Sequence, residues 1–178
     1  MTATAFDTVS EVPLSRWDPI QGSPEITDRC DESALMLNIE YFDNKAFSVA
    51  PMESSAMDPQ QRLLMENSYQ VLHAVHYKRH ELLGSNVAVL VGIASNEFAQ
   101  VPRPASVYGI GGVGHCFACG RISYILGLQG LCETIDTACS SSLVGCHTAV
   151  LVLQRGECQA AVLAGVAAML LPTISVLY

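Results

Sequence analysis

The stretch Glu133-Thr134-Ile135-Asp136-Thr137-Ala138-Cys139-Ser140-Ser141-Ser142-Leu143 decides the fold. An apolar, strand-forming run over 131–135 ends in small residues, one cysteine and three serines, and a helical pattern follows. A strand, a sharp turn and a helix in this order display a side chain at the turn, and a helix N-terminus there favours a thiolate. A single cysteine is more often buried for packing alone. The neighbouring residues favour Cys139 as a nucleophile instead.

The composition indicates a folded, acidic domain. Of 178 residues, 50% are hydrophobic and 15% are charged, which is typical of a chain with a large core and unfavourable for disorder. The formal net charge of -8 argues against nucleic acid as a partner. The seven cysteines occur without a secretory signal, so we expect a reducing, cytoplasmic location and no disulfide framework.

The uncharged segment 160–178 is long enough to raise the question of a membrane span. Pro172, Gly165 and the lack of basic residues after the segment argue against one. A buried strand that continues into a second buried element accounts for the pattern equally well. We predict that the chain has no membrane span.

Alternating apolar patterns predict an α/β fold. Asp58-Pro59 should begin a helix that reaches about Tyr77, with Asp58 as its N-cap. Strands are expected over 87–94, 131–135 and 158–168, of which the first and the last should be buried. A loop is expected over 95–112, and helices over 113–126 and 140–154. The helix over 140–154 should be buried and central because it has few polar positions, and Gly156 should end it.

Three other motifs suggest cofactor or metal sites. Residues 109–114 read G-x-G-x-x-G but do not follow a strand, so dinucleotide binding is disfavoured. Residues 116–119 form C-x-x-C without a second pair at zinc-finger spacing, which favours two small hydrophobic residues on a helix. His73, His76 and His80 recur at helical spacing without a carboxylate or cysteine at ligand spacing. We predict no directly bound cofactor and no metal.

A cysteine hydrolase would pair Cys139 with a histidine. His147 is eight residues further along the same predicted helix, more than two turns away, so it should not reach the thiol. His115 is the other nearby histidine in the sequence, and the sequence alone does not place it.

Four ordered blocks resemble the β-ketoacyl synthase (ketosynthase) domain of type I polyketide synthases and animal-type fatty acid synthases. These blocks are Val12-Pro13-Leu14-Ser15-Arg16-Trp17-Asp18, Met57-Asp58-Pro59-Gln60-Gln61-Arg62-Leu63-Leu64-Met65-Glu66, Gly120-Arg121-Ile122-Ser123-Tyr124-Ile125-Leu126-Gly127-Leu128, and 136–143 with its continuation through 156–158. The resemblance spans about residue 9 to the end, and its first block favours the polyketide branch.

The resemblance implies an incomplete thiolase-like fold, layered α-β-α-β-α, of which this chain is mainly the N-terminal half. It implies that Cys139 accepts an acyl chain from the phosphopantetheine thioester of an acyl carrier protein for decarboxylative Claisen condensation. The expected partners are that carrier protein and a homodimer mate or other ketosynthase segments.

The resemblance also implies a truncated domain. Residues 1–10 form a short lead, and 11–178 form a partial N-terminal domain that lacks its first strand. The two histidines that assist decarboxylation in the family lie beyond Tyr178, so we expect acyl acceptance at most from these residues alone. The alternative is a non-catalytic ketosynthase remnant that binds a partner through open sheet edges. Residues 114–119 depart from the small residues usual in the family.

Overall fold

The structure is a computed structural model that describes residues 7–14, 16 and 32–172. The chain divides into two compact units, of which the first is Met1–Ile39 with Met169–Tyr178 and the second is Glu40–Ala168. Part of the first sequence block, with Ser15, Trp17 and Asp18, lies outside the described residues.

The first unit contains a short antiparallel pair. Strand β1 (Ser10–Glu11) pairs with β2 (Glu32–Ser33). The Arg16 guanidinium donates a hydrogen bond from Nη2 to the carbonyl oxygen of Met36 at 2.7 Å.

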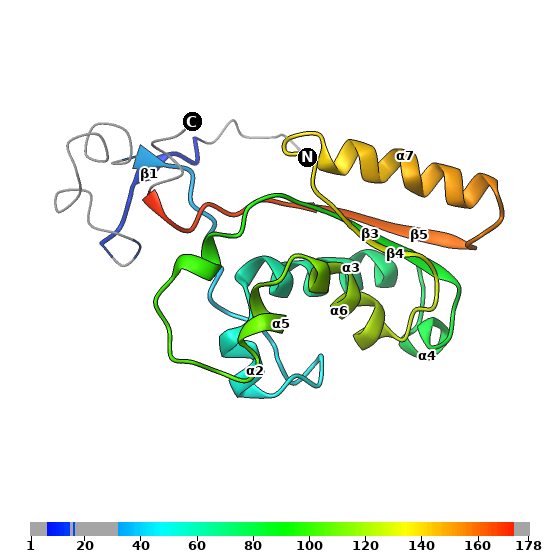
Figure 1. Cartoon of the computed structure of the whole chain (residues 1–178), viewed down its shortest axis with the longest axis horizontal. Helices are drawn as coiled ribbons and strands as arrows, with labels where there is room; N and C mark the ends of the chain where they lie inside the picture. Colours follow the sequence, from blue (N-terminus) through cyan, green and yellow to red (C-terminus); the bar gives the residue numbers. More distant parts are fainter. Residues whose placement is uncertain (1–6, 15, 17–31, 173–178) are drawn as a thin grey trace. The chain divides into compact units, whose positions relative to one another are not determined.

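The second unit is built on a parallel sheet of three strands in the order β4-β3-β5 (Figure 1). The strands are β3 (Val87–Ile93), β4 (Cys132–Ile135) and β5 (Ala160–Val166). Every residue of β3 is buried, as expected for a continuous apolar run in the centre of a parallel sheet. Because the three strands are parallel, their carboxyl ends lie at one edge of the sheet. The segment that follows β4 starts at this edge.

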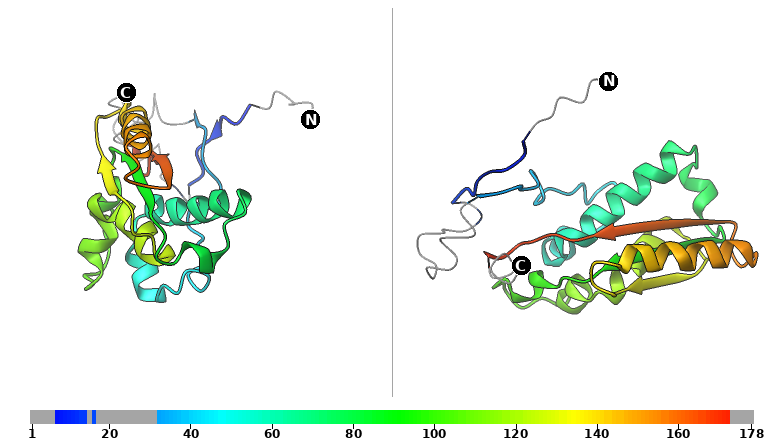
Figure 2. Two further views of the ribbon diagram at one scale, coloured as in Figure 1. Left: turned by 90° about the vertical axis from the view of Figure 1, so that its right-hand side faces the viewer. Right: turned by 90° about the horizontal axis from the view of Figure 1, so that it is seen from above.

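Helices cover both faces of this sheet. Helix α7 (Ser141–Gln154) lies on one face, while α3 (Pro59–Ala74) and α6 (Cys116–Leu126) lie on the other (Figures 1 and 2). Alternate side chains of β3 belong to two hydrophobic clusters, one on each face of the sheet. Val89 packs with α3 and α6, whereas Leu90 packs with α7. The shorter helices are α2 (Pro51–Ala56), α4 (Arg79–Leu82), η2 (Glu97–Gln100) and α5 (Gly109–Val113).

The predicted α/β alternation is confirmed, but several predicted boundaries are wrong. The expected loop over 95–112 contains η2 and α5. The expected helix over 113–126 is interrupted at Gly114, whose extended backbone separates α5 from α6. Helix α3 ends at Ala74 rather than near Tyr77, because His76 adopts a left-handed φ of 69° that ends helical hydrogen bonding.

The prediction that the helix over 140–154 is buried and central is wrong for one side of α7. Its buried residues, such as Gly145 and Ala149, face the sheet. The opposite side is apolar and exposed, and it comprises Leu143, Val144, Val150 and Leu153. The pattern indicated apolar surface on two sides, and within the second unit only one of them is covered.

The uncharged segment near the end of the chain begins as a strand. Ala160–Val166 is β5 and pairs along its whole length with β3, so the predicted strand is confirmed. Its predicted burial is not, because Val162 is the one buried residue of β5. Through residues 7–14, 16 and 32–172, no helix combines the length and apolarity that a bilayer crossing needs.

Candidate functional site

Cys139 lies in a tight corner between β4 and α7. Strand β4 ends at Ile135 and α7 begins at Ser141, so the turn uses only the five residues between them. Ala138 adopts a left-handed φ of 56°, which is uncommon for a residue with a side chain and concentrates at turns that position functional groups. The Cys139 side chain is exposed beside the start of α7. The predicted corner is confirmed.

The side chains of the turn hold the corner together. The Asp136 carboxylate accepts a hydrogen bond from the Ala138 N–H at 3.0 Å. The Ser140 hydroxyl donates to the Thr137 carbonyl at 2.8 Å. The Ser141 hydroxyl donates to the Ala138 carbonyl at 2.7 Å and accepts from the Thr137 N–H at 2.9 Å. The two serines that follow Cys139 therefore fix the backbone of the turn around it, and their hydroxyls are used for this task.

Two paired glycines bring the first turn of α7 against the sheet. Gly92 of β3 lies opposite Gly165 of β5 in the strand register. A Cβ at Gly92 would lie 2.8 Å from the backbone nitrogen of Ser142. A Cβ at Gly165 would lie 2.9 Å from the Ser142 hydroxyl oxygen. A side chain at Gly92 would push the start of α7, and with it the corner, away from the sheet, whereas one at Gly165 would first displace the Ser142 side chain.

Gln60 joins the ends of two strands at the edge where Cys139 lies. Its side chain is fully buried, and its Nε2 donates to the carbonyl of Ser95 at 3.0 Å. Its Oε1 accepts from the N–H of Ala168 at 3.0 Å. Ser95 follows β3 and Ala168 follows β5, so one amide satisfies backbone groups of both.

The rest of the Asp-Pro-Gln-Gln-Arg motif has a similar role. Gln61 donates to the Gly114 carbonyl at 3.3 Å and accepts from Nε of Arg121 at 2.7 Å. Arg62 donates from Nη1 to the Glu40 carbonyl at 2.9 Å. The motif was recognised in the sequence as a marker only. The motif places polar residues in an otherwise apolar part of the sequence. This pattern could have indicated that their side chains hydrogen-bond to backbone groups.

Asp58 caps α3 as predicted, because its carboxylate accepts the N–H of Gln60 at 2.7 Å. The residue is 1% exposed. Burial raises the pKa of the Asp58 carboxyl above its ordinary 3.8, against the opposing effects of its hydrogen bonds with Gln60 and the charges of His115 and Arg62. The folded state therefore binds the Asp58 proton more tightly than the unfolded state does.

This binding difference predicts a pH-dependent effect of Asp58→Asn. The stabilisation by protonated Asp58 is complete below pH 3.8 and is lost as the pH rises through the raised folded-state pKa. Asparagine is also an N-cap and does not titrate, so the variant should gain stability relative to wild type as the pH rises through this window. Urea unfolding at several pH values measures this, with exposed Asp43→Asn as the control. A stability difference that is independent of pH would contradict it.

Neither candidate histidine is hydrogen-bonded to the thiol. The His115 Nε2 lies 3.0 Å from the Ser95 carbonyl oxygen and bonds to it. His147 is exposed on α7, as expected from its spacing. A histidine-activated cysteine pair of the hydrolase kind is therefore not assembled in the part of the chain that the structure describes.

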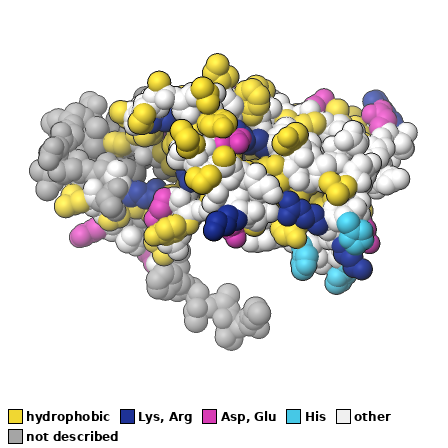
Figure 3. Space-filling view, turned by 90° about the horizontal axis from the view of Figure 1, so that it is seen from below, with side chains coloured by type: hydrophobic (Ala, Val, Ile, Leu, Met, Phe, Trp, Pro, Cys, Tyr) yellow, Lys and Arg dark blue, Asp and Glu magenta, His cyan; other side chains and the backbone are white. Residues whose placement is uncertain are grey.

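The other sequence motifs lie in ordinary structural settings. Residues 109–114 form α5 and the residue after it, and they do not follow a strand. Cys116 and Cys119 lie on α6, as predicted. His73, His76 and His80 are exposed. His73 lies on α3, whereas His76 and His80 come after the end of this helix, so the three do not share one helix. Figure 3 shows histidines near one end of the molecule. No group of three metal-binding side chains occurs within the described ranges.

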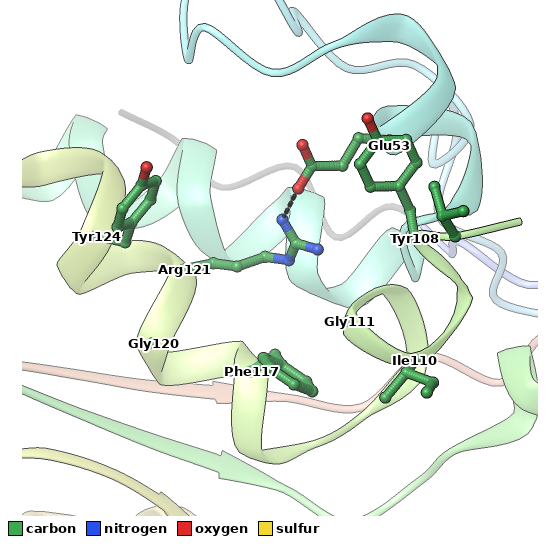
Figure 4. A pocket seen from close by; sticks show the side chains of 9 residues that line it. Glu53, Tyr108, Ile110, Gly111, Phe117, Gly120, Arg121 and Tyr124 are labelled. Atoms are coloured by element: carbon green, nitrogen blue, oxygen red, sulfur yellow. Dashed lines mark hydrogen bonds and ion pairs between the residues drawn. The ribbon is translucent and has the colours of Figure 1, made fainter.

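A separate hollow of about 420 Å³ lies among α2, α5 and α6 (Figure 4). Arg121 and Glu53 form an ion pair there at 2.5 Å. The remaining wall is mainly apolar and includes Tyr108, Phe117 and Tyr124. Cys139 does not line this hollow, so the hollow is distinct from the corner between β4 and α7.

Comparisons with known proteins give one consistent result. The family described as "Beta-ketoacyl synthase, N-terminal domain" matches residues 3–178. Erythronolide synthase EryA2 of Saccharopolyspora erythraea is 38% identical over 96% of this chain, which spans 5% of that protein. Pikromycin polyketide synthase component PikAII of Streptomyces venezuelae is 36% identical over 97% of the chain, again with 5% of the relative covered.

A solved structure supports the same result. The chain is similar to the ketosynthase from module 6 of the bacillaene synthase from Bacillus subtilis 168, with a TM-score of 0.79 and 34% sequence identity. The similarity covers 93% of this chain and 28% of the solved chain. The parallel sheet with helices on both faces is thus the N-terminal part of a thiolase-like fold, as the sequence predicted.

Proposed function

Because the chain belongs to the β-ketoacyl synthase family and matches its N-terminal domain, we propose that Cys139 is the acyl acceptor of a polyketide ketosynthase. The Cys139 thiolate attacks the carbonyl carbon of an acyl thioester on the phosphopantetheine arm of an acyl carrier protein. A new bond joins the Cys139 sulfur to that carbon, the bond from the carbon to the pantetheine sulfur breaks, and the pantetheine thiolate leaves.

The observation that carries this proposal is the exposed thiol at the start of α7. The N–H groups of the first helical turn have no partner within the helix, and together with the helix dipole they favour negative charge. That charge is the thiolate before attack and the oxyanion during it. By the family resemblance, the Cys139 N–H would donate to the oxyanion.

The proposed step is limited to acyl acceptance. These residues cover 28% of the solved ketosynthase, and acyl acceptance is the first half-reaction of the decarboxylative condensation that the family resemblance implies. No cofactor is required for the transfer itself, because the carrier protein delivers the acyl group on its own phosphopantetheine. The negative charge and the cysteine content support a cytoplasmic location.

The experiment that tests this function uses the butyryl thioester of N-acetylcysteamine, a short analogue of the pantetheine arm. The wild-type chain should gain the mass of one butyryl group, and Cys139→Ala should gain none. Cys146→Ala is the matched control, because Cys146 is an exposed cysteine of α7, the helix that follows Cys139. Equal labelling of wild type and Cys139→Ala would refute the proposal.

We also propose that the exposed apolar side of α7 packs against the remainder of a ketosynthase domain. Four large apolar side chains on one helix are unfavourable in water, and the layered fold of the family places further elements beyond this helix. This proposal accounts for the difference between the predicted central helix and its exposed face.

The apolar side of α7 can be tested by substitution. Leu143→Glu should abolish binding of the separately produced C-terminal part of the domain, because it places a charge in the contact, and should leave the circular dichroism spectrum unchanged. Leu143 is 74% exposed, so the unbound chain should tolerate the change. Wild-type affinity in Leu143→Glu would contradict the packing. Binding by a chain that takes up no acyl group would favour the non-catalytic remnant.

A further inference from the structure

Two cysteines outside the nucleophile corner lie together between α6 and β4. The Thr134 hydroxyl on β4 is 3.1 Å from the sulfur of Cys119 on α6 and donates to it. Cys132 is two residues before Thr134 on the same strand. Since side chains two apart on a strand point to the same face, Cys132 also faces α6 beside Cys119.

The two thiols differ in their access to solvent. Cys119 is 4% exposed, and its sulfur contacts the Cys116 carbonyl at 3.7 Å. Burial raises the pKa of the Cys119 thiol to about 11, the Thr134 hydroxyl lowers it, and Cys132 raises it as a hydrogen-bond partner and a nearby charge. Cys132 is exposed. One sulfur can therefore meet a dissolved oxidant while the other is held behind it as a neutral thiol.

We propose that Cys132 and Cys119 are a peroxide-sensitive dithiol that closes to a disulfide. The Cys132 thiolate attacks one oxygen of hydrogen peroxide, the O–O bond breaks, and a sulfenic acid and hydroxide form. The Cys119 sulfur then attacks the Cys132 sulfur, an S–S bond forms, and the S–O bond breaks. The departing hydroxide takes the Cys119 proton and leaves as water, so two thiols are oxidised and one peroxide is reduced to two waters.

The location of this pair gives the oxidation a structural consequence. Helix α6 and strand β4 are otherwise joined by noncovalent contacts, and β4 runs directly into the corner that contains Cys139. A disulfide between Cys119 and Cys132 would tether that strand to the helix beneath it. This inference concerns the thiol pair alone and does not depend on acyl transfer at Cys139.

The test is oxidation of the full chain by hydrogen peroxide in a Cys139→Ala background, which removes the exposed nucleophile. We expect the intact mass to fall by that of two hydrogen atoms. Chymotrypsin cleaves after Phe117 and so separates Cys116 from Cys119. The digest should contain a linked peptide pair that carries Cys119 and Cys132 and that disappears on reduction.

Two variants establish which sulfurs react. Cys132→Ser should abolish the link, and Cys116→Ser, the matched control one helical turn from Cys119, should retain it. Both cysteines replaced here are exposed, so the folded circular dichroism spectrum should persist. A link from Cys132 to Cys116, a link retained in Cys132→Ser, or stepwise oxygen addition without any link would overturn the proposal.

Discussion

Gly92→Ala should strongly reduce the proposed acylation of Cys139 while leaving the Cys139 thiol itself in the chain. The added Cβ would lie 2.8 Å from the Ser142 nitrogen and 3.0 Å from the Ser141 carbonyl carbon. Both are backbone atoms at the start of α7, so no side-chain rotation relieves the clash. Overpacking costs about 1–3 kcal/mol in general, and we expect the upper part of this range because β3 is buried in the centre of the sheet.

The butyryl adduct at Cys139 and the melting temperature measure this effect together. At about 2–4 °C per kcal/mol for a chain of this size, Gly92→Ala should lower Tm by roughly 5–10 °C. Gly120→Ala is the matched control, because an added Cβ at this position in α6 meets nothing within 4 Å. The control should keep its acylation rate and gain up to about 1 kcal/mol from helix propensity. Unchanged acylation in Gly92→Ala would contradict the close approach of α7 to β3.

Gln60→Leu should cause the largest loss of stability that we predict. The substitution removes three hydrogen bonds of a fully buried amide, because the Asp58 carboxylate, the Ser95 carbonyl and the Ala168 N–H all lose this partner. The Ser95 carbonyl keeps its bond to His115 and the Asp58 carboxylate keeps the Gln60 N–H, whereas the Ala168 N–H loses the partner that it has here. An unsatisfied buried polar group costs about 1–3 kcal/mol and each further lost hydrogen bond about 0.5–1.5 kcal/mol, so we expect about 2–5 kcal/mol in all. The polar cost dominates because leucine has a similar volume and leaves little cavity.

Urea unfolding measures the effect of Gln60→Leu. Gln70→Leu on the same helix is the control, because Gln70 is exposed and its replacement should change the free energy of unfolding by less than about 0.5 kcal/mol. Similar losses in the two variants would show that Gln60 does not join the strand ends. A loss confined to Gln60→Leu would establish that the Asp-Pro-Gln-Gln-Arg motif supports the carboxyl edge of the sheet.

Local sequence signals predicted the parts of the fold that depend on local physics. Asp58 and Pro59 begin α3 because capping and a fixed φ act within one turn. Gly156, with a φ of 68°, follows the last residues of α7 for the same kind of reason. The apolar run 87–94 predicted β3 because a strand buried on both faces needs no polar alternation.

The features that depend on distant contacts were not predictable in this way. The pairing of Gly92 with Gly165 depends on strand register, and these residues are far apart in the sequence. Gln60 reaches Ala168, 108 residues later, and no local pattern indicates that partner. The exposed side of α7 was predicted as buried because periodicity reports how apolar a surface is, not what covers it.

The location of the acyl group in the labelled chain tests the central claim most directly. After reaction with the butyryl thioester, trypsin should release Ile122–Arg155, the peptide that contains Cys132, Cys139 and Cys146. Fragment-ion masses then assign the added group to one sulfur. We predict the butyryl group on Cys139 with Cys132 and Cys146 unmodified. A butyryl group spread over all three exposed cysteines, or absent from Cys139, would contradict a dedicated acyl acceptor at this corner.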